Sequence, residues 1–388
     1  MDYEKIPKLK DLDLKNKIVF LRTDYNVPLD NEGNILNDFR IKASLMTIKE
    51  ILKKSAKKIV IGTHLGRPKT KEKIFQTTNI AKKLVLLTSR KVEKLSDCIN
   101  VKEEIEDSDA KLIILENLRF YEEEKKNDVE FAKKLSESCD VFVNDAFGVC
   151  HRTHASVHAI TRFLPSCIGL LVEKELSIFH EALNDPKRPL NVLLGGSKLE
   201  TKLPAIQHLV EKADNLLLGG AMVFTFFKAK GYSIGKSLLD KDSVSMAKIL
   251  LNNDKIILPE DIVIADDKDA PTNIVNVKPN YIPAYMIGLD LGEKTISKYS
   301  TMLSESKTII WNGPLGYYEN KEFSKATFAL IKVLANHDGK VIVGGGDTAS
   351  MVEQLGLRDM FYHVSTGGGA SLKLLEGDSL PALSVLIK

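Results

Sequence analysis

The sequence predicts an α/β protein with two domains of parallel sheet, and three observations support this. At 388 residues the chain is too long for one ordinary hydrophobic core and fits two average domains. Short β-branched runs end in polar loops in the first half of the chain and in glycine turns in the second half. A strand, triglycine and helix pattern occurs twice, 23 residues apart, which is the length of a tight βαβ unit.

In the first half, buried strands are predicted at 17–21, 59–61, 112–115 and 141–143, each ending in a polar loop. The side chains of these loops that could contact a ligand are Arg22, Asp24, Asn26, Arg40, His64, Arg67, Arg119 and Arg152. Open α/β sheets bind ligands at the carboxyl ends of their strands. If the strands are parallel, these loops share one edge, which favours a binding site over isolated satisfied loops.

The distribution of arginine supports an anion site in this half. Nine of the 55 lysine and arginine residues are arginines, and seven of the nine precede residue 170. Lysine is therefore the usual surface cation of this chain. An arginine is expected where a planar, bidentate donor must hold a phosphate or a carboxylate.

Other segments of the first half have simpler interpretations. A helix is predicted through 45–52, a third strand at 84–88, and a solvated helix start at 122–126. His151, His154 and His158 have helical spacing, but no second ligand cluster accompanies them and Arg152 lies among them. An anion contact or a capping role is therefore expected rather than zinc.

The second half is predicted to be a sheet edged by glycine. A long helix at 170–183 ends before Pro186 and Pro189, where a domain boundary is expected. Strands are predicted at 192–194, 216–218 and 309–311. The loops that follow them contain Gly195, Gly196, Lys198, Lys202, Gly219, Gly220, Asn312, Gly313, Gly316 and Glu319. Lysine beside a glycine turn at a helix start has the polarity that a nucleotide phosphate requires.

The two triglycine turns, 344–346 and 367–369, follow strands predicted at 341–343 and 361–364. Glycine lets a backbone lie close to a ligand, and the N–H groups that begin a helix have no partner inside it, so such turns hold anions. One triglycine alone could be a tight turn, but a pair favours a polyphosphate. Asp347 could hold the accompanying Mg²⁺.

Composition excludes several functional classes. A net charge of +3 with 28% charged residues implies neither a nucleic-acid nor a membrane partner. The amino-terminal residues carry both signs of charge and lack an apolar signal core, and the longest apolar stretch, 216–227, is too short to span a bilayer. A cytoplasmic protein is expected, with its four cysteines reduced.

Two partial motif matches are set aside. The segment 231–237 resembles a P-loop but has one residue too few between its glycines. The segment 344–349 satisfies a loose dinucleotide fingerprint, but the acidic ribose ligand expected about 20 residues later is absent, since Asp359 comes too early and Glu376 too late.

Taken together, the ordered segments resemble the phosphoglycerate kinase family over essentially the whole chain. The segments that carry the resemblance are 22–28, 64–68, 116–120, 144–148 with His151 and Arg152, 173–176, 195–198, 311–316, 344–348 and 365–371. The resemblance implies two doubly wound, Rossmann-like α/β domains joined by a helix, with a cleft between them. The implied domains are 1–172, which binds 3-phosphoglycerate, and 188–375, which binds nucleotide. Residues 173–187 form the interdomain helix and linker, and the tail 376–388 packs on the first domain.

The resemblance also implies the site residues. For 3-phosphoglycerate they are Asp24, Tyr25, Asn26, Arg40, His64, Leu65, Gly66, Arg67, Arg119 and Arg152. For MgATP or MgADP they are Lys198, Lys202, Gly219, Gly220, Asn312, Glu319, Gly345, Gly346, Asp347 and Thr348, with Asp347 at the metal. Arg40, Lys198, Gly368 and Gly369 are expected to act on the migrating phosphoryl group. The family suggests a cytoplasmic monomer.

The implied reaction is reversible phosphoryl transfer between 1,3-bisphosphoglycerate and MgADP, giving 3-phosphoglycerate and MgATP. Two alternatives remain at this point. One is a dinucleotide-dependent dehydrogenase, based on the loose fingerprint, which leaves the early arginines unexplained. The other is a non-catalytic nucleotide-binding or scaffolding protein that kept the fold.

Overall fold

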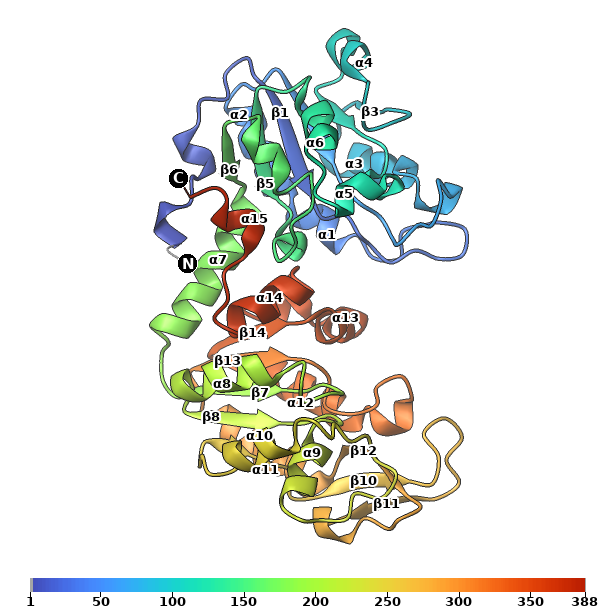
Figure 1. Cartoon of the computed structure of the whole chain (residues 1–388), viewed down its shortest axis with the longest axis vertical. Coiled ribbons are helices and arrows are strands. Elements are labelled where there is room, and N and C mark those ends of the chain that lie inside the picture. The colour runs from blue at the N-terminus through green and yellow to red at the C-terminus, as the bar shows by residue number, and fades with distance from the viewer. Residues whose placement is uncertain (1–2, 388) are drawn as a thin grey trace. The chain divides into compact units, whose positions relative to one another are not determined.

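The computed structural model describes residues 3–387 and divides into two compact units. Unit 1 comprises the residues up to Ser177 together with the segment from Ser379 onward, and unit 2 comprises Ile178–Asp378. The boundary between Ser177 and Ile178 falls inside α7 (Leu170–Asn184), labelled in Figure 1. Each unit contains a six-stranded sheet in which every pair of neighbouring strands is parallel. The predicted class of two parallel-sheet α/β domains is therefore confirmed.

The sheet of unit 1 has the order β3-β4-β2-β1-β5-β6. Its strands are β1 (Ile18–Thr23), β2 (Lys58–Gly62), β3 (Val92–Lys94), β4 (Leu112–Ile114), β5 (Val141–Asp145) and β6 (Ser166–Ile168). All residues of β1, β2, β4 and β5 are buried, as expected for parallel strands covered on both faces. The order reverses between β1 and β5, so the ligand crevice of a doubly wound sheet is expected at their carboxyl ends.

Helices cover both faces of this sheet and form two hydrophobic clusters. They are α1 (Phe39–Ala43), α2 (Leu45–Lys53), α3 (Thr78–Thr88), α4 (Lys102–Asp107), α5 (Glu122–Lys125) and α6 (Val129–Ser136). One cluster joins strand residues such as Val19 and Ile61 to α2 and α3, and the other joins Phe20 and Phe142 to α6. Alternate residues of one strand thus contribute to opposite faces.

The strand predicted at 84–88 is wrong, because this segment is the last part of α3. Ile80, Ala81 and Leu84 recur at helical spacing and are the buried residues of that helix. The exposed Val85 and Leu86 completed an apolar run that looked like a strand. The strand predicted at 361–364 is also shorter than expected, since β15 comprises only His363–Val364.

The segment around the three histidines is not a continuous helix. Short 3-10 turns occur at Phe147–Val149 and Ala159–Arg162, and the residues between them form turns. The helical spacing of His151, His154 and His158 therefore has no helical counterpart in the structure.

The sheet of unit 2 has the order β15-β14-β13-β7-β8-β9. Its remaining strands are β7 (Leu190–Leu194), β8 (Asn215–Leu218), β9 (Ile256–Ile257), β13 (Thr308–Asn312) and β14 (Lys340–Gly344). The order reverses between β7 and β13, which places the expected crevice at the ends of these two strands. A second sheet of order β11-β10-β12 is formed by β10 (Ile262–Ala265), β11 (Ile274–Val277) and β12 (Ile287–Leu291).

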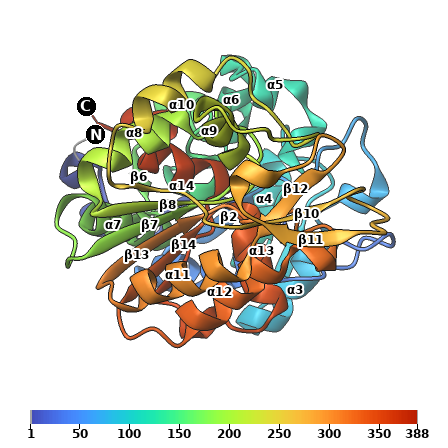
Figure 2. The ribbon, with the colours of Figure 1, turned by 90° about the horizontal axis from the view of Figure 1, so that it is seen from below.

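Helices also lie on both faces of the large sheet of unit 2. They are α8 (Leu203–Lys212), α9 (Val223–Ala229), α10 (Val244–Leu250), α11 (Glu293–Ser304), α12 (Lys325–Ala335), α13 (Gly346–Gln354) and α14 (Gly368–Leu375). Figure 2 shows α8 and α10 on one side of the strands and α11 and α12 on the other. None of the helices in the described part of the chain is long and apolar enough to cross a membrane.

The last helix, α15 (Pro381–Ser384), belongs to unit 1 although it follows unit 2 in the chain. The Ala382 N–H donates a hydrogen bond to the Cys150 carbonyl at 3.2 Å. Ala382, Leu383 and Leu386 are buried, so the segment is held by packing as well.

Asp145, at the end of β5, anchors the first turn of α7. Its Oδ1 accepts hydrogen bonds from the N–H groups of Leu171 at 3.0 Å and Val172 at 3.4 Å. A Cβ on Gly169 would lie 2.2 Å from the same oxygen, so only glycine permits this approach. Burial raises the pKa of Asp145 to about 7, although the hydroxyl of Thr47 and the two N–H groups act in the opposite direction.

We expect Asp145→Asn to remove part of the pH dependence of stability. Because the pKa of Asp145 is raised in the folded state, its protonation favours folding. The wild type should therefore lose stability as the pH rises from about 4 to about 7, on the order of 2–4 kcal/mol. Asparagine stays neutral and keeps an oxygen acceptor for Leu171, so the variant should gain relative stability over this range. Urea unfolding at pH 5 and pH 8 measures the difference, and equal pH dependence in both proteins would contradict the assignment.

Candidate active site

In unit 1 the structure brings the predicted cationic loops together at one sheet edge. Strands β4, β2, β1 and β5 are neighbours and parallel, so the loops after them start side by side. Arg22 and Asp24 come from the end of β1, His64 from the end of β2, and Arg119 from the 3-10 turn after β4.

Asp24 lies at the centre of this group. Its carboxylate forms an ion pair with Arg40 of α1, and its Oδ1 lies 3.7 Å from His64 Nε2. Burial alone would raise the pKa of Asp24, but the neighbouring guanidinium groups of Arg40 and Arg22 outweigh it, and the pKa is lowered to about 2. The carboxylate is therefore ionised at neutral pH and fixes the direction of the Arg40 side chain.

Arg22 is fully buried beneath the site and forms part of its support. Its Nε donates to Ser156 Oγ at 2.7 Å, and its guanidinium lies 3.6 Å from the Glu124 carboxylate. Burial lowers the pKa of Arg22, while Glu124 opposes that shift. The prediction of a solvated helix start at 122–126 is therefore wrong at one residue, Glu124. The segment contains α5, but Glu124 is completely buried because it neutralises Arg22.

Arg119 has a guanidinium group whose hydrogen-bond donors are only partly paired within the protein. Its Nη1 donates to the Gly66 carbonyl at 2.7 Å, but its buried Nε has no hydrogen-bond partner within residues 3–387. Burial lowers the pKa of Arg119 to about 10, with smaller contributions from Arg22 and Arg67. A buried N–H donor of this kind suits an anionic ligand, because a ligand acceptor would satisfy it.

Arg67 and Arg152 belong to the same electrostatic group. Arg67 lowers the pKa of Arg119, and Arg152 contributes with Arg22 and Arg119 to the low pKa of His154. Burial is the largest cause of that low value, which is about 4, so His154 is neutral at pH 7. A neutral histidine here leaves the positive charge on the arginines.

The remaining predicted residues of unit 1 have backbone or packing roles in the structure. The Asn26 side-chain oxygen accepts from the Gly66 N–H at 2.8 Å. Leu65 is buried, and its N–H donates to Asn117 at 3.2 Å. The ring of Tyr25 is fully buried in the core, and its hydroxyl lies 2.6 Å from Ser44 Oγ. The side chains of Leu65 and Tyr25 therefore support the loops from the core.

In unit 2 the loops that follow β7 and β13 lie too close together to admit a side chain at Gly195. The Gly195 N–H donates to the Asn312 carbonyl at 2.9 Å, and a Cβ on Gly195 would lie 1.9 Å from the Pro314 carbonyl oxygen. Gly313 has a φ of +94°. Glycine is required at both positions, at one by the close approach and at the other by the backbone conformation.

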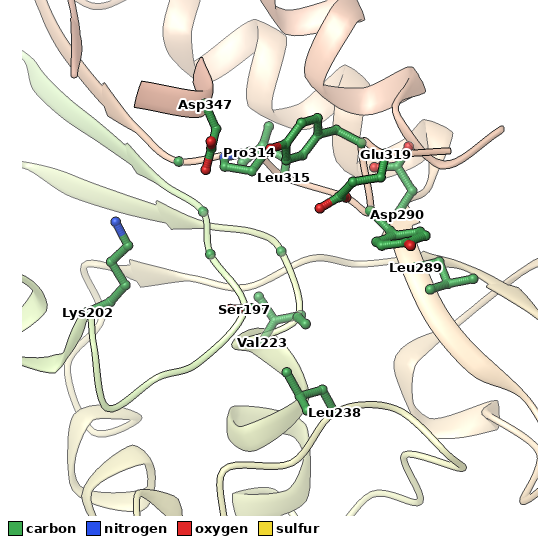
Figure 3. A pocket seen from close by; sticks show the side chains of 18 of the residues that line it. Ser197, Lys202, Val223, Leu238, Leu289, Asp290, Pro314, Leu315, Glu319 and Asp347 are labelled. Carbon is green, nitrogen blue, oxygen red and sulfur yellow. The ribbon is translucent and has the colours of Figure 1, made fainter. Parts of the chain in front are cut away.

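A cavity of about 760 Å³ opens at this point, and Figure 3 shows part of its lining. Nine of the predicted nucleotide and phosphoryl residues line it, namely Lys202, Gly220, Asn312, Glu319, Gly345, Gly346, Asp347, Gly368 and Gly369. Lys202 and Leu289 lie at opposite ends of the cavity in this view. The size is within the range of small-molecule and cofactor sites.

The two triglycine turns meet at the cavity, as their spacing suggested. Strands β14 and β15 pair in parallel, and a Cβ on Gly368 would lie 3.3 Å from the Gly346 nitrogen. Gly345 has a φ of +89°, and nothing lies within 4 Å of a Cβ built on Gly346. The first N–H groups of α13 and α14 are therefore adjacent, and the space beside Gly346 is open to a ligand.

Lys202 is the most perturbed cation of this cavity. Its Nζ donates to Asn312 Oδ1 at 2.5 Å. Burial lowers the pKa of Lys202 to about 8, although Glu376 and Asp347 act in the opposite direction. An anionic ligand beside it would raise this pKa and favour the charged amine.

Three predicted residues do not line the cavity. Lys198 is exposed in the turn after β7, and its charge contributes to the lowered pKa of Asp240. Gly219 packs against Leu315, a lining residue, since a Cβ there would lie 2.6 Å from the Leu315 side chain. Thr348 is buried, and its hydroxyl accepts from the Gly313 N–H at 3.0 Å.

The cavity offers one carboxylate suited to magnesium. Asp347 is exposed in the first turn of α13, and within residues 3–387 no group of three or more His, Cys, Asp or Glu side chains could hold a metal ion. Mg²⁺ commonly takes one or two protein carboxylates and completes its shell with phosphate and water. Asp347 is an accessible carboxylate in the first turn of α13, beside the two triglycine turns, so its chemistry fits Mg²⁺ that arrives with an anionic ligand.

Sequence reasoning missed the apolar wall of the cavity. Val223 and Leu238 lie on one side, and Leu289 lies beyond them near Asp290 and Glu319 (Figure 3). Tyr318, also missed, is held near Asp347, and burial together with Asp347 and Glu319 raises its pKa to about 12. No local pattern could reveal this wall, because its residues come from three separate segments and resemble ordinary core residues.

Comparison with known proteins identifies the family. The family model described as phosphoglycerate kinase matches residues 9–378. The chain belongs to the phosphoglycerate kinase family. It is 43% identical to the phosphoglycerate kinase of a Nostoc species over 401 residues, covering 100% of this chain and 99% of that protein. It is 45% identical to that of Dictyoglomus turgidum, covering 97% of each.

Solved structures agree. The phosphoglycerate kinase of Coxiella burnetii has a TM-score of 0.84 at 35% identity, and that of Pyrococcus horikoshii has 0.85 at 32%, each covering 98% of both chains. The chain is therefore a phosphotransferase, a kinase of glycolysis that binds ATP. This result excludes the dehydrogenase and the non-catalytic scaffold as interpretations of the sequence.

We expect Glu124→Gln to destabilise the kinase by about 3 kcal/mol, because it leaves the Arg22 guanidinium buried without its counter-ion. The combined variant Arg22→Met/Glu124→Gln should cost less than the sum of the two single changes. Glu123→Gln, an exposed neighbour in the same helix, is the control and should change stability little. Chemical denaturation measures all four proteins, and an additive double variant would rule out the pairing.

Proposed function

We propose that unit 1 binds 3-phosphoglycerate or 1,3-bisphosphoglycerate and that unit 2 binds MgATP or MgADP. The observation that carries this assignment is the difference between the two sites. One site pairs Arg22 and Arg40 with buried carboxylates and has further arginines close by, and the other is a glycine-lined cavity with an apolar wall. The first suits a small substrate with anionic ends, and the second suits a base linked to phosphates.

In unit 1, the guanidinium groups would hold the phosphate and carboxylate of the substrate. Arg119 offers its buried, unsatisfied Nε, and Arg67 and Arg152 add charge nearby. Arg40 is only partly buried and is oriented by Asp24, so it remains able to contact ligand. His64 and Asn26 would complete the set as neutral partners, since burial keeps the pKa of His64 well below its usual value.

In unit 2, the apolar wall would accept the base and Glu319 would accept hydrogen bonds from the sugar. The phosphates would lie on the N–H groups of Gly345, Gly346 and the start of α14, with Lys202 beside them. Asp347 would hold the Mg²⁺ that accompanies the nucleotide and neutralises its phosphate charge.

The transfer itself needs no general base. In the ATP-consuming direction a carboxylate oxygen of 3-phosphoglycerate attacks the γ-phosphorus. The new O–P bond forms as the bond to the ADP oxygen breaks, and the leaving oxygen takes that electron pair. The acceptor is already ionised at neutral pH, so catalysis rests on positioning and charge neutralisation. Arg40, Lys198 and the amides of Gly368 and Gly369 are proposed to stabilise the migrating group.

Lys198 is exposed and outside the cavity lining, so its proposed role requires the turn after β7 to move when ligand binds. Gly196, with a φ of +153°, lies in this turn and gives it backbone freedom. The enzyme is further proposed to be a cytoplasmic monomer with small-molecule substrates and no nucleic-acid or membrane partner. A relative from Triticum aestivum, 44% identical, is named as cytosolic, which supports the compartment.

We expect Arg40→Ala to lower turnover of 3-phosphoglycerate by about 100-fold or more, the usual effect of losing a group that contacts the transition state. Arg40→Lys should recover only part of this, because an ammonium lacks the planar fork. Arg90→Ala, which removes an exposed arginine from a different part of unit 1, is the control. A coupled spectrophotometric assay measures kcat and KM, and undiminished activity in Arg40→Ala would remove this residue from the mechanism.

We expect ADP binding to weaken as the pH rises above about 8, because Lys202 then loses its proton in the free enzyme. Bound phosphate favours the charged amine, so the Kd should be flat below pH 8 and rise by up to about tenfold per pH unit above it. Lys202→Arg stays charged and should abolish this rise. Isothermal titration calorimetry from pH 7 to 9.5 measures both proteins. Parallel curves would show that another group is responsible.

A further inference from the structure

Three buried aspartates share one arrangement in this protein. Each accepts hydrogen bonds from the first N–H groups of a helix and lies against a glycine whose missing Cβ makes room for the carboxylate. The sets are Asp145 with Gly169 and α7, Asp261 with Gly292 and α11, and Asp290 with Gly316 and α12. A Cβ on these glycines would lie 2.2, 2.3 and 2.2 Å from its aspartate. Of the three, Asp290 alone lines the nucleotide cavity within the described chain.

Asp290 connects two elements of the cavity wall. It lies in β12 and is 4% exposed. Its Oδ1 accepts from the Leu291 N–H at 2.9 Å, and its Oδ2 accepts from the Ala326 N–H at 3.1 Å in the first turn of α12. Figure 3 shows Asp290 on the same side of the cavity as Glu319 and Leu289.

The loop that carries Glu319 rests on this carboxylate. Gly316 lies against Asp290 Oδ1 and against the Phe323 carbonyl, so a Cβ there would meet each at 2.2 and 2.3 Å. The next residue, Tyr317, donates its N–H to the Leu289 carbonyl at 2.7 Å. Glu319 follows two residues later, so the loop that carries it is held by the packing of Gly316 on Asp290 and by the Leu289 carbonyl beside it.

The charge of Asp290 has no cation within salt-bridge distance in the described chain. Burial raises its pKa to about 7, and the N–H groups of Ala326, Leu291 and Lys325 and the more distant charge of Lys325 act in the opposite direction. Burying an acid without a cation costs free energy, so the contacts that Asp290 makes must offset this cost. Asp290 joins β12, the start of α12 and the loop at Gly316, through two backbone N–H groups and close packing.

We propose that Asp290 is a positioning residue that holds the loop 313–320 so that Glu319 reaches the nucleotide. Asp290 itself does not take part in phosphoryl transfer. This inference rests on the proposed function, in which Glu319 contacts the sugar. It assigns to Asp290 an effect on nucleotide affinity alone.

Asp290→Asn tests the proposal with almost no change in shape. An amide has one acceptor oxygen and one NH₂ group, so in either orientation one of the two N–H groups faces a donor instead of an acceptor. We expect the KM for ADP to rise about tenfold. The kcat at saturating ADP and the KM for 1,3-bisphosphoglycerate should change less than twofold. Hydrogen exchange of the Tyr317 amide should become faster.

Asp261→Asn is the matched control. Asp261 is equally buried, accepts from the Thr295 and Lys294 N–H groups at 2.8 and 3.1 Å, and lies against Gly292, but it does not line the cavity. It should lose stability without a change in the KM for ADP or in Tyr317 exchange. Gly316→Ala is a second test, because its Cβ would collide with Asp290 and displace the loop from it. This variant should also raise the KM for ADP.

Glu319→Gln separates this inference from the proposed function. If Glu319→Gln weakens ADP binding and both Asp290→Asn and Gly316→Ala leave it unchanged, the positioning role is overturned while the nucleotide site stands. If Glu319→Gln has no effect, the proposed sugar contact fails, and the inference fails with it. A KM change in Asp261→Asn equal to that in Asp290→Asn would show a general loss of stability and would also overturn it.

Discussion

The close approach of backbone at the ends of β7 and β13 is the constraint on which the cavity of unit 2 depends. Gly195 and Gly313 let the loops after β7 and β13 lie against each other where the strand order reverses. The cavity opens at that point. A side chain at Gly195 would collide with the Pro314 carbonyl and force the strands apart. The helices α13 and α14 also begin at this edge, because parallel strands all end on the same side of the sheet.

The arginine half depends on charge rather than on close packing. A buried guanidinium is tolerated only with a counter-ion, and Glu124 supplies it for Arg22 beneath the site. Asp24 does the same for Arg40 at the surface of the site. Because these carboxylates already pair with Arg22 and Arg40, the buried Nε of Arg119 keeps a donor that an anionic ligand can use.

Most of the strands and the glycine turns were predictable because their signals are local. Buried β-branched runs and triglycines can be recognised from a few consecutive residues. Errors occurred where a local pattern is ambiguous, as at Leu84, where an apolar helix end resembles a strand. Partners distant in the chain were also missed. The burial of Glu124 and the role of Asp290 follow from contacts with residues 102 and 36 positions away.

By itself, the sequence determined the α/β class, the two-domain length, and the types of residue available at each strand end. The reason is that strand and helix periodicity and glycine conformations are properties of short segments. Only the tertiary structure decided which carboxylates are buried as counter-ions, which apolar residues form a cavity wall instead of core, and which lysine loses its proton near pH 8. Those outcomes depend on desolvation and on neighbours from distant segments, and no local pattern encodes either.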